Sequence, residues 1–185
     1  MSDIEINIQT ICLNSLMKVF PDEAPDTIHY SNSTNKGTAL LNEAYSFQIA
    51  YCSEHLSNVK VTVESELSQF ISIYEVGLVP AEYPAPEDHD GDFLRTAPGL
   101  FPDPLYQLEQ GCAIIALPGQ WRSIWVEVNP KGMARPGNYP ITVSFVYDDD
   151  VKAAEETYTL ELIDAMLPEQ SMPCINWFHA DCLSS

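Results

Sequence analysis

Ser123-Ile124-Trp125-Val126-Glu127-Val128 is the stretch of this chain that decides its fold. Its aliphatic residues stand at every second position, with serine, tryptophan and glutamate between them. Because successive side chains of a strand point to opposite faces, this period of two predicts a strand with one buried face. Pro130 follows and is expected to end the strand, since proline has no N–H to donate to a sheet ladder.

The same alternation recurs along the chain and predicts about eight strands. It is carried by Ile4, Ile6 and Ile8; Tyr45, Phe47, Ile49 and Tyr51; Val59, Val61 and Val63; Ile71 and Ile73; Ala113 to Leu117; Ile124, Val126 and Val128; Ile141, Val143, Phe145 and Tyr147; and Tyr158, Leu160 and Leu162. Strands with one apolar face are typical of antiparallel sheets packed face to face. We therefore expect an all-β, antiparallel β-sandwich of immunoglobulin-like type over residues 1–168.

The segment from Pro80 to Leu108 interrupts this pattern and holds six of the 14 prolines. It is predicted to be one long Pro-rich loop, and loops of this length are often functional. Within it, Asp88, Asp90 and Asp92 have the spacing of a calcium loop but lack the distal bidentate glutamate. An acidic turn is the favoured interpretation and no metal site is predicted, although the sequence leaves cation binding by these three carboxylates open.

The charge balance of the chain restricts its partners. Eight basic residues stand against 27 acidic ones, for a formal charge of −19. Phosphate binding needs clustered Lys and Arg, so neither nucleic acid nor an anionic membrane is an expected partner. The chain has five cysteines, an odd number, and no two of them form a CxxC pair. No signal peptide is recognisable at the N-terminus. These observations together indicate a cytoplasmic protein with free thiols.

Motifs of catalysis are not found in the sequence. It contains no Gly-x-Ser-x-Gly elbow and no glycine-rich phosphate loop, and its four histidines stand in unrelated contexts. This chain by itself is therefore not expected to be an enzyme, and no cofactor is predicted. The most informative residue is Trp125, because the alternation places it on the face opposite the core. A tryptophan on that face needs a partner, which is a sugar ring, another domain or the Pro-rich loop.

Several segments, taken in order, resemble one family. They are Ser15 to Glu23, Ala97 to Leu105, Ser123 to Val128 with Pro136 to Tyr139, Leu167 to Gln170, and Asn176 to Asp181. Their order is similar to the N-terminal β-sandwich region of glycoside hydrolase family 123-like proteins, relatives of domain of unknown function 4091. In that family the sandwich precedes a (β/α)₈-type barrel that cleaves N-acetylgalactosaminides with an adjacent Asp-Glu pair. The Asp22-Glu23 dipeptide of this chain does not match that catalytic position.

The resemblance implies a division of the chain. Cys174 to Phe178 reads as the start of a strand close to the end of the sequence. Residues 169–185 are accordingly interpreted as a linker and the truncated start of a (β/α)₈-type catalytic domain, in which His179 and Asp181 would follow the first barrel strand. The longer parent protein would be a glycoside hydrolase of N-acetylhexosaminidase-like type.

Two functions remain open from the sequence. The first is a non-catalytic accessory domain that braces its own C-terminal catalytic domain. The alternative is an autonomous carbohydrate-binding module that uses exposed aromatic residues such as Trp125. The residues predicted to contact carbohydrate or the neighbouring domain are Trp125, Glu127, Phe101, Asp103, Tyr106, Trp177, His179 and Asp181.

Overall fold

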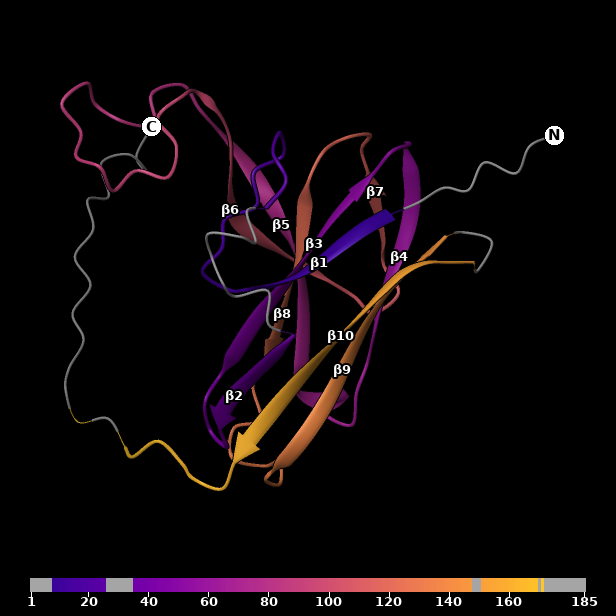
Figure 1. Ribbon diagram of the computed structural model, residues 1–185. Coiled ribbons are helices and arrows are strands. Elements are labelled where there is room, and N and C mark those ends of the chain that lie inside the picture. The colour runs from indigo at the N-terminus through magenta and orange to yellow at the C-terminus, as the bar shows by residue number, and fades with distance from the viewer. Residues whose placement is uncertain (1–7, 26–34, 148–150, 170, 172–185) are drawn as a thin grey trace, which may run out of the picture.

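The computed structural model describes residues 8–25, 35–147, 151–169 and 171. These residues form two five-stranded sheets that pack face to face (Figure 1). The first sheet holds, in spatial order, β1 (Ile8–Asn14), β3 (Tyr45–Ser53), β8 (Arg122–Val128), β5 (Ile71–Ala81) and β6 (Gly99–Leu108). The second holds β2 (Lys36–Leu40), β10 (Lys152–Ile163), β9 (Gly137–Tyr147), β4 (Ser57–Glu64) and β7 (Ala113–Ala116). The predicted all-β sandwich is confirmed.

Strand pairing is antiparallel throughout the first sheet. In the second sheet β10 pairs antiparallel with β9 but parallel with β2, so this sheet is mixed. A 3₁₀ turn, η1 (Ser68–Phe70), precedes β5. No residue of the described ranges belongs to a helix long and apolar enough to cross a membrane. The strand order does not test the prediction that the sandwich is of immunoglobulin-like type.

The core lies between the sheets and is built from the alternating residues that the sequence indicated. On β8, Ile124, Val126 and Val128 are completely buried. The Phe47 ring of β3 stacks on the Tyr158 ring of β10, with centroids 4.0 Å apart and planes 8° apart. Burying a side chain of this size contributes roughly 1.5–3 kcal/mol to folding. These contacts join the two sheets, because Phe47 and Tyr158 come from different layers.

The predicted long loop from Pro80 to Leu108 is wrong over much of its length. β5 runs to Ala81, and Gly99 to Leu108 form β6, so the connection between the strands is residues 82–98, which extends from the ends of β5 and β6 in Figure 1. β6 was not predicted because it contains prolines, which are uncommon within strands. They are tolerated because β6 is the edge strand of its sheet, where one side needs no ladder hydrogen bonds.

The short strand β2 is not among the strands that the alternation predicts. Gly37 is required there by packing. A Cβ atom added to it would lie 2.0 Å from Tyr45 Oη and 2.5 Å from Tyr158 Oη. These two hydroxyls are hydrogen-bonded to each other at 2.6 Å. A glycine in a strand often marks such a close approach, but it weakens the strand signal in the sequence.

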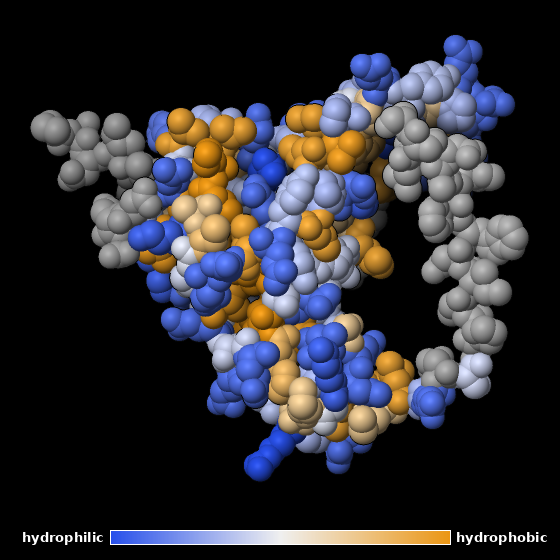
Figure 2. Space-filling view, turned by 180° about the vertical axis from the view of Figure 1, so that it is seen from behind, coloured by the Kyte–Doolittle hydropathy of each residue, from blue (hydrophilic) through white to orange (hydrophobic). Residues whose placement is uncertain are grey.

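The outer surface reflects the acidic composition. Seen from behind, hydrophilic side chains cover much of the molecule, and apolar ones form separate patches between them (Figure 2). The 27 acidic residues of the chain outnumber its 8 basic ones more than threefold. A surface of this kind favours solubility and disfavours anionic partners.

Two of the thiols differ sharply in accessibility, which leads to a first prediction. Cys12 is buried between the sheets; burial, with the nearby charge of Glu156, raises the pKa of its thiol to about 12. Cys112 is exposed. Because the thiolate is the reactive form, iodoacetamide at pH 8 is expected to alkylate Cys112 in the folded protein and to spare Cys12 until the protein unfolds. Peptide mass spectrometry over time measures both, and equal rates at the two cysteines in the folded protein would contradict the prediction.

Candidate functional site

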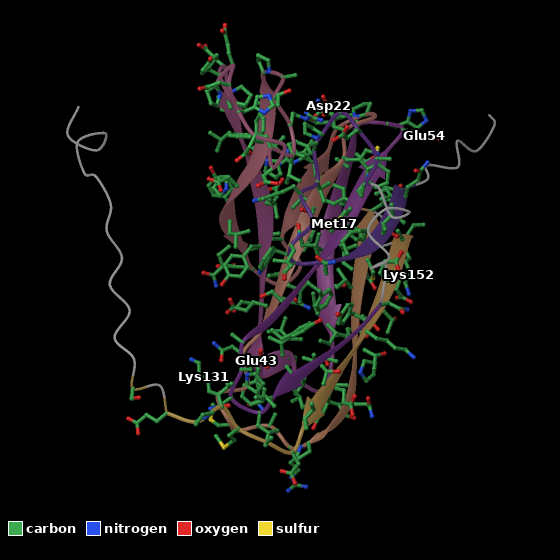
Figure 3. All side chains as sticks on the ribbon, turned by 60° about the vertical axis from the view of Figure 1, so that its left-hand side comes forward. Met17, Asp22, Glu43, Glu54, Lys131 and Lys152 are labelled. Carbon is green, nitrogen blue, oxygen red and sulfur yellow. The ribbon has the colours of Figure 1, made fainter. Side chains whose placement is uncertain are left out.

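Residues 15–25, here called the crossing segment, leave β1 and run over the outer face of the first sheet. Val19 is almost completely buried and packs with Leu13, Ala50 and Trp121 in a small second cluster outside the main core. Figure 3 places Met17 midway along the strands and Asp22 near one end of the sandwich. The segment begins over β1 and β3 and reaches β6, where Lys18 Nζ donates to the carbonyl of Pro102 at 3.3 Å and the Phe20 ring packs on Phe101.

Gln48 of β3 fixes the start of the crossing segment. Its side chain is buried, and its amide nitrogen Nε2 lies 3.2, 3.4 and 2.9 Å from the carbonyl oxygens of Asn14, Ser15 and Met17, to which it donates. Its Oε1 accepts a hydrogen bond of 2.9 Å from Ser123 Oγ. The polar groups of this buried amide are thus satisfied, as burial requires. One side chain of the sheet therefore holds the last carbonyl group of β1 and two carbonyl groups of the crossing segment.

Arg95 ties the 82–98 connection to the crossing segment. Its guanidinium lies 4.0 Å from the centre of the Phe20 ring, and its nitrogens are 2.8 Å from Asp22 and 3.0 Å from Glu23. The hydrogen bond from Arg95 holds the pKa of the Asp22 carboxyl below its ordinary value. The Arg95 side chain is 14% exposed, so the cation–π contact forms partly away from water, where such contacts are stronger.

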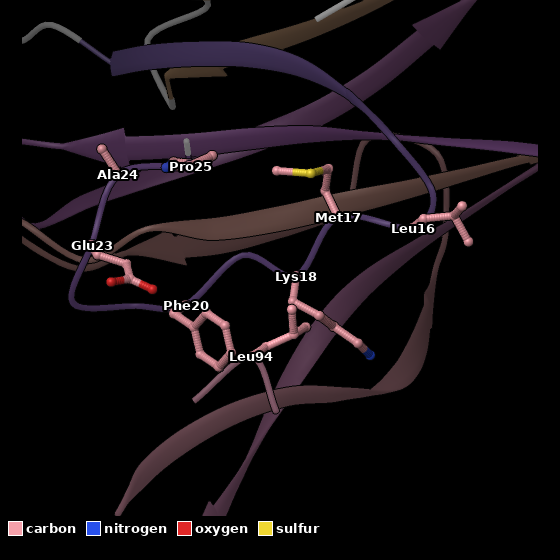
Figure 4. Close-up of a pocket in the computed structure, with 8 residues that line it drawn as sticks. All are labelled: Leu16, Met17, Lys18, Phe20, Glu23, Ala24, Pro25 and Leu94. Carbon is pink, nitrogen blue, oxygen red and sulfur yellow. The ribbon is translucent and has the colours of Figure 1, made fainter. Parts of the chain in front are cut away.

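Two depressions lie on either side of Met17 and Lys18, which line both of them. The first, of about 290 Å³, is mainly apolar and is shown in Figure 4. It is lined by Leu16, Met17, Lys18, Phe20, Glu23, Ala24, Pro25 and Leu94. The second, of about 200 Å³, opens onto the sheet itself and is lined by Ser15, Met17, Lys18, Gln48, Val76, Pro102, Asp103, Leu105 and Trp125.

The structure brings some of the predicted site residues together. Trp125 and Asp103 line the second depression. Glu127 is two residues from Trp125 on the same face of β8, so it lies on the outer face as predicted. Tyr106 is 60% exposed on β6, and its ring lies over Gly77 of β5.

The other predicted site residues are used differently or lie outside the described part. Phe101 packs edge-on against Phe20, with ring centroids 5.5 Å apart, so its ring belongs to the support of the crossing segment. Trp177, His179 and Asp181 lie outside the described residues. The hypothesis that these three contribute to a site stays a prediction.

Sequence reasoning missed the residue that lies directly beside Trp125. Tyr74 of β5 is its cross-strand partner, and both side chains are partly exposed. The alternation with Ile71 and Ile73 marks Tyr74 as a residue of the polar face, but only the strand order shows that it neighbours Trp125. Gln48 and the crossing segment were missed as well, because this segment has no period that would reveal its course.

No group of three or more His, Cys, Asp or Glu side chains within the described ranges is arranged to hold a metal ion. Around Asp88, Asp90 and Asp92, the backbone N–H of Asp92 donates to Asp90 Oδ1 at 3.1 Å. This is the hydrogen bond of an ordinary acidic turn. The outer face of the first sheet presents aromatic rings, carboxylates, amides and hydroxyls.

Comparison with known proteins gives a fold match of substance. No family model and no curated protein matches the chain. Among solved structures, a family 123 glycoside hydrolase from Clostridium perfringens, described for glycolipid glycan hydrolysis, matches with a TM-score of 0.62 and 16% identity over 88% of this chain. The chain spans only 28% of the length of that enzyme.

Weaker matches concern other proteins of similar size. They include AvmM, which catalyses macrocyclisation in alchivemycin A biosynthesis, with a TM-score of 0.40 and 9% identity over 92% of this chain and 94% of that one. A type I cohesin from Pseudobacteroides cellulosolvens matches with a TM-score of 0.33 and 13% identity over 76% of this chain and 95% of that one. The chain is thus an all-β sandwich whose fold is similar to a part of a family 123 glycoside hydrolase.

Proposed function

We propose that this chain is a non-catalytic accessory β-sandwich domain of a glycoside hydrolase-like protein, which braces a catalytic domain of the (β/α)₈ type. The observation that carries the proposal is the fold match to a family 123 glycoside hydrolase over 88% of this chain but only 28% of that enzyme. The rest of a protein of that kind is large enough to hold the catalytic domain. The resemblance of the sequence segments from Ser15 to Asp181 to the same family supports the proposal independently of the fold.

An exposed apolar patch, consisting of Leu16 and Leu94, supports the bracing role. Leu16 is 88% exposed and Leu94 is 66% exposed, and both line the first depression (Figure 4). Single exposed leucines are common on protein surfaces, but neighbouring ones around a hollow often mark a contact surface. We assign this patch to the catalytic domain of the same protein, because the crossing segment and the 82–98 connection fix its shape.

The test compares this chain with the longer native gene product. The double substitution Leu16→Asp with Leu94→Asp is expected to change the stability of the isolated chain by less than about 0.5 kcal/mol, since both residues are on its surface. In the longer protein the same change is expected to lower the melting temperature, because the domain contact loses apolar area and buries two carboxylates. Differential scanning calorimetry of both forms measures the effect.

The matched control is Ile115→Asp on β7, an exposed aliphatic residue of the opposite sheet. It should leave the longer protein as stable as the wild type. Hydrolysis of 4-nitrophenyl N-acetyl-β-galactosaminide is expected from the longer protein and not from this chain alone. A native product without a further domain, or equal effects of the double substitution and Ile115→Asp, would contradict the proposal.

A further inference from the structure

The outer face of the first sheet carries two partly exposed aromatic side chains from neighbouring strands. Trp125 of β8 and Tyr74 of β5 are direct ladder partners, so both project from the same face of the sheet. Neighbouring strands lie about 4.8 Å apart, which sets these two side chains next to each other. Within the described ranges, neither ring is paired with another aromatic ring.

Polar side chains extend the same rows. Tyr74 faces Gln107 of β6, and Glu127 of β8 faces Ser72 of β5. In the described part of the chain, the side chains of Glu127, Gln107 and Ser72 have no hydrogen-bond or ion-pair partner. A carboxylate accepts hydrogen bonds, and an amide or a hydroxyl both donates and accepts them. Two aromatic rings are therefore bordered by groups whose hydrogen-bonding capacity is available to a ligand.

We propose that Trp125, Tyr74, Glu127, Gln107 and Ser72, with the 200 Å³ depression beside Trp125, form a binding site for a neutral oligosaccharide. A pyranose ring has an apolar C–H face, which packs on aromatic side chains, and hydroxyl groups around its edge. Those hydroxyls donate to Glu127 and exchange hydrogen bonds with Gln107 and Ser72. Amphipathic aromatic residues with a few placed polar groups are the usual means of binding such a ligand.

The charges of the face select a neutral sugar over other ligands. Glu127 and Asp103 outnumber Lys18, the cation that lines the same depression, in a chain of formal charge −19, so phosphates, uronic acids and sialylated sugars are disfavoured. A protein partner would have to desolvate these carboxylates, and the cores of protein interfaces are depleted of charged residues. A neutral sugar leaves the carboxylates hydrogen-bonded and partly hydrated.

The site is held rigid by the sheet. β8 is paired on both sides, with β3 and with β5, so the backbone of Trp125 lies in the middle of the sheet. The buried Gln48 beside it is fixed by its hydrogen bonds to the crossing segment and to Ser123. Because little side-chain or loop freedom remains to be lost, binding costs less conformational entropy. The inference is independent of the proposed bracing role, which uses the patch at Leu16 and Leu94.

The test is isothermal titration calorimetry on the 185-residue chain with chitotetraose and cellotetraose as neutral probes and 3′-sialyllactose as an anionic one. Saturable binding of at least one neutral probe is expected, with weaker or no binding of sialyllactose. Trp125→Ala and Tyr74→Ala should each weaken binding at least about tenfold, which corresponds to 1.4 kcal/mol. Glu127→Gln, which keeps the shape and removes the charge, should weaken it several-fold.

Tyr83→Ala is the matched control, because Tyr83 is a highly exposed tyrosine of the 82–98 connection, away from these strands. It should bind like the wild type. If Trp125→Ala loses its circular dichroism signal, Tyr74→Ala and Glu127→Gln decide the question. Absence of binding of both neutral probes to the folded chain, or affinities that Tyr74→Ala and Glu127→Gln leave unchanged, would overturn the proposal. Equal binding of sialyllactose would overturn the choice of a neutral ligand.

Discussion

Replacing Phe47 by alanine is expected to lower the free energy of unfolding by about 3–5 kcal/mol. Phe47 is completely buried, and its ring stacks on Tyr158 at a centroid distance of 4.0 Å. The substitution removes both the transfer free energy of the ring and the main aromatic contact between the two sheets. Small domains are stable by only about 5–15 kcal/mol. The Phe47→Ala variant is therefore expected to unfold at a clearly lower urea concentration than the wild type.

Urea titration followed by far-UV circular dichroism measures this loss. Phe93→Ala serves as the control, because Phe93 is 42% exposed in the 82–98 connection and outside the core. It should cost less than about 1 kcal/mol, as surface substitutions usually do. Phe47→Leu should fall between the two, since leucine refills part of the cavity. A midpoint for Phe47→Ala equal to that of Phe93→Ala would contradict the packing described here.

The strands that were predictable are those whose two faces differ strongly in polarity. The alternation at Ile141, Val143 and Phe145 in β9, like that in β4, β8 and β10, follows from one buried and one more exposed face, which a sequence records directly. The edge strands were harder. β6 contains Pro102 and Pro104 and is mostly exposed, so neither propensity nor period identified it.

The sequence was sufficient to predict that single residues of the candidate site lie on the outer face, but not which of them are neighbours. The alternation around Ile124 and Val126 was sufficient to place Trp125 and Glu127 on the outer face. Their neighbour Tyr74 comes from a strand about 50 residues earlier, and strand order is a long-range property that alternation within each strand does not determine. The course of the crossing segment over this face could not be predicted either. Residues 15–25 are held by hydrogen bonds with Gln48 and Trp121, and their sequence has no repeating pattern.

Gln48→Leu is expected to lower the free energy of unfolding by about 1–3 kcal/mol, because it leaves partly buried carbonyl groups without a donor. The carbonyls of Ser15 and Met17 lose their donor, and the carbonyl of Asn14 keeps the 3.4 Å hydrogen bond from the Met17 N–H. Leucine fills a similar volume, so the loss arises from the hydrogen bonds rather than from a cavity. The comparison variant is Ser123→Ala, which removes one neutral bond to Gln48 Oε1 and should cost less than Gln48→Leu.

The same substitution should act locally before it acts globally, since Gln48 connects the crossing segment to the sheet. The backbone N–H of Trp121 donates to the carbonyl of Pro21 at 3.0 Å, so its hydrogen exchange reports whether the segment stays in place. Faster exchange at Trp121 is expected in Gln48→Leu, with β9 and β10 still protected. Because Ser15, Met17 and Lys18 line the depression beside Trp125, affinity for a neutral oligosaccharide should fall together with that protection. Faster exchange throughout both sheets, with none specific to Trp121, would mean that Gln48 supports the sandwich as a whole and does not hold the crossing segment in particular.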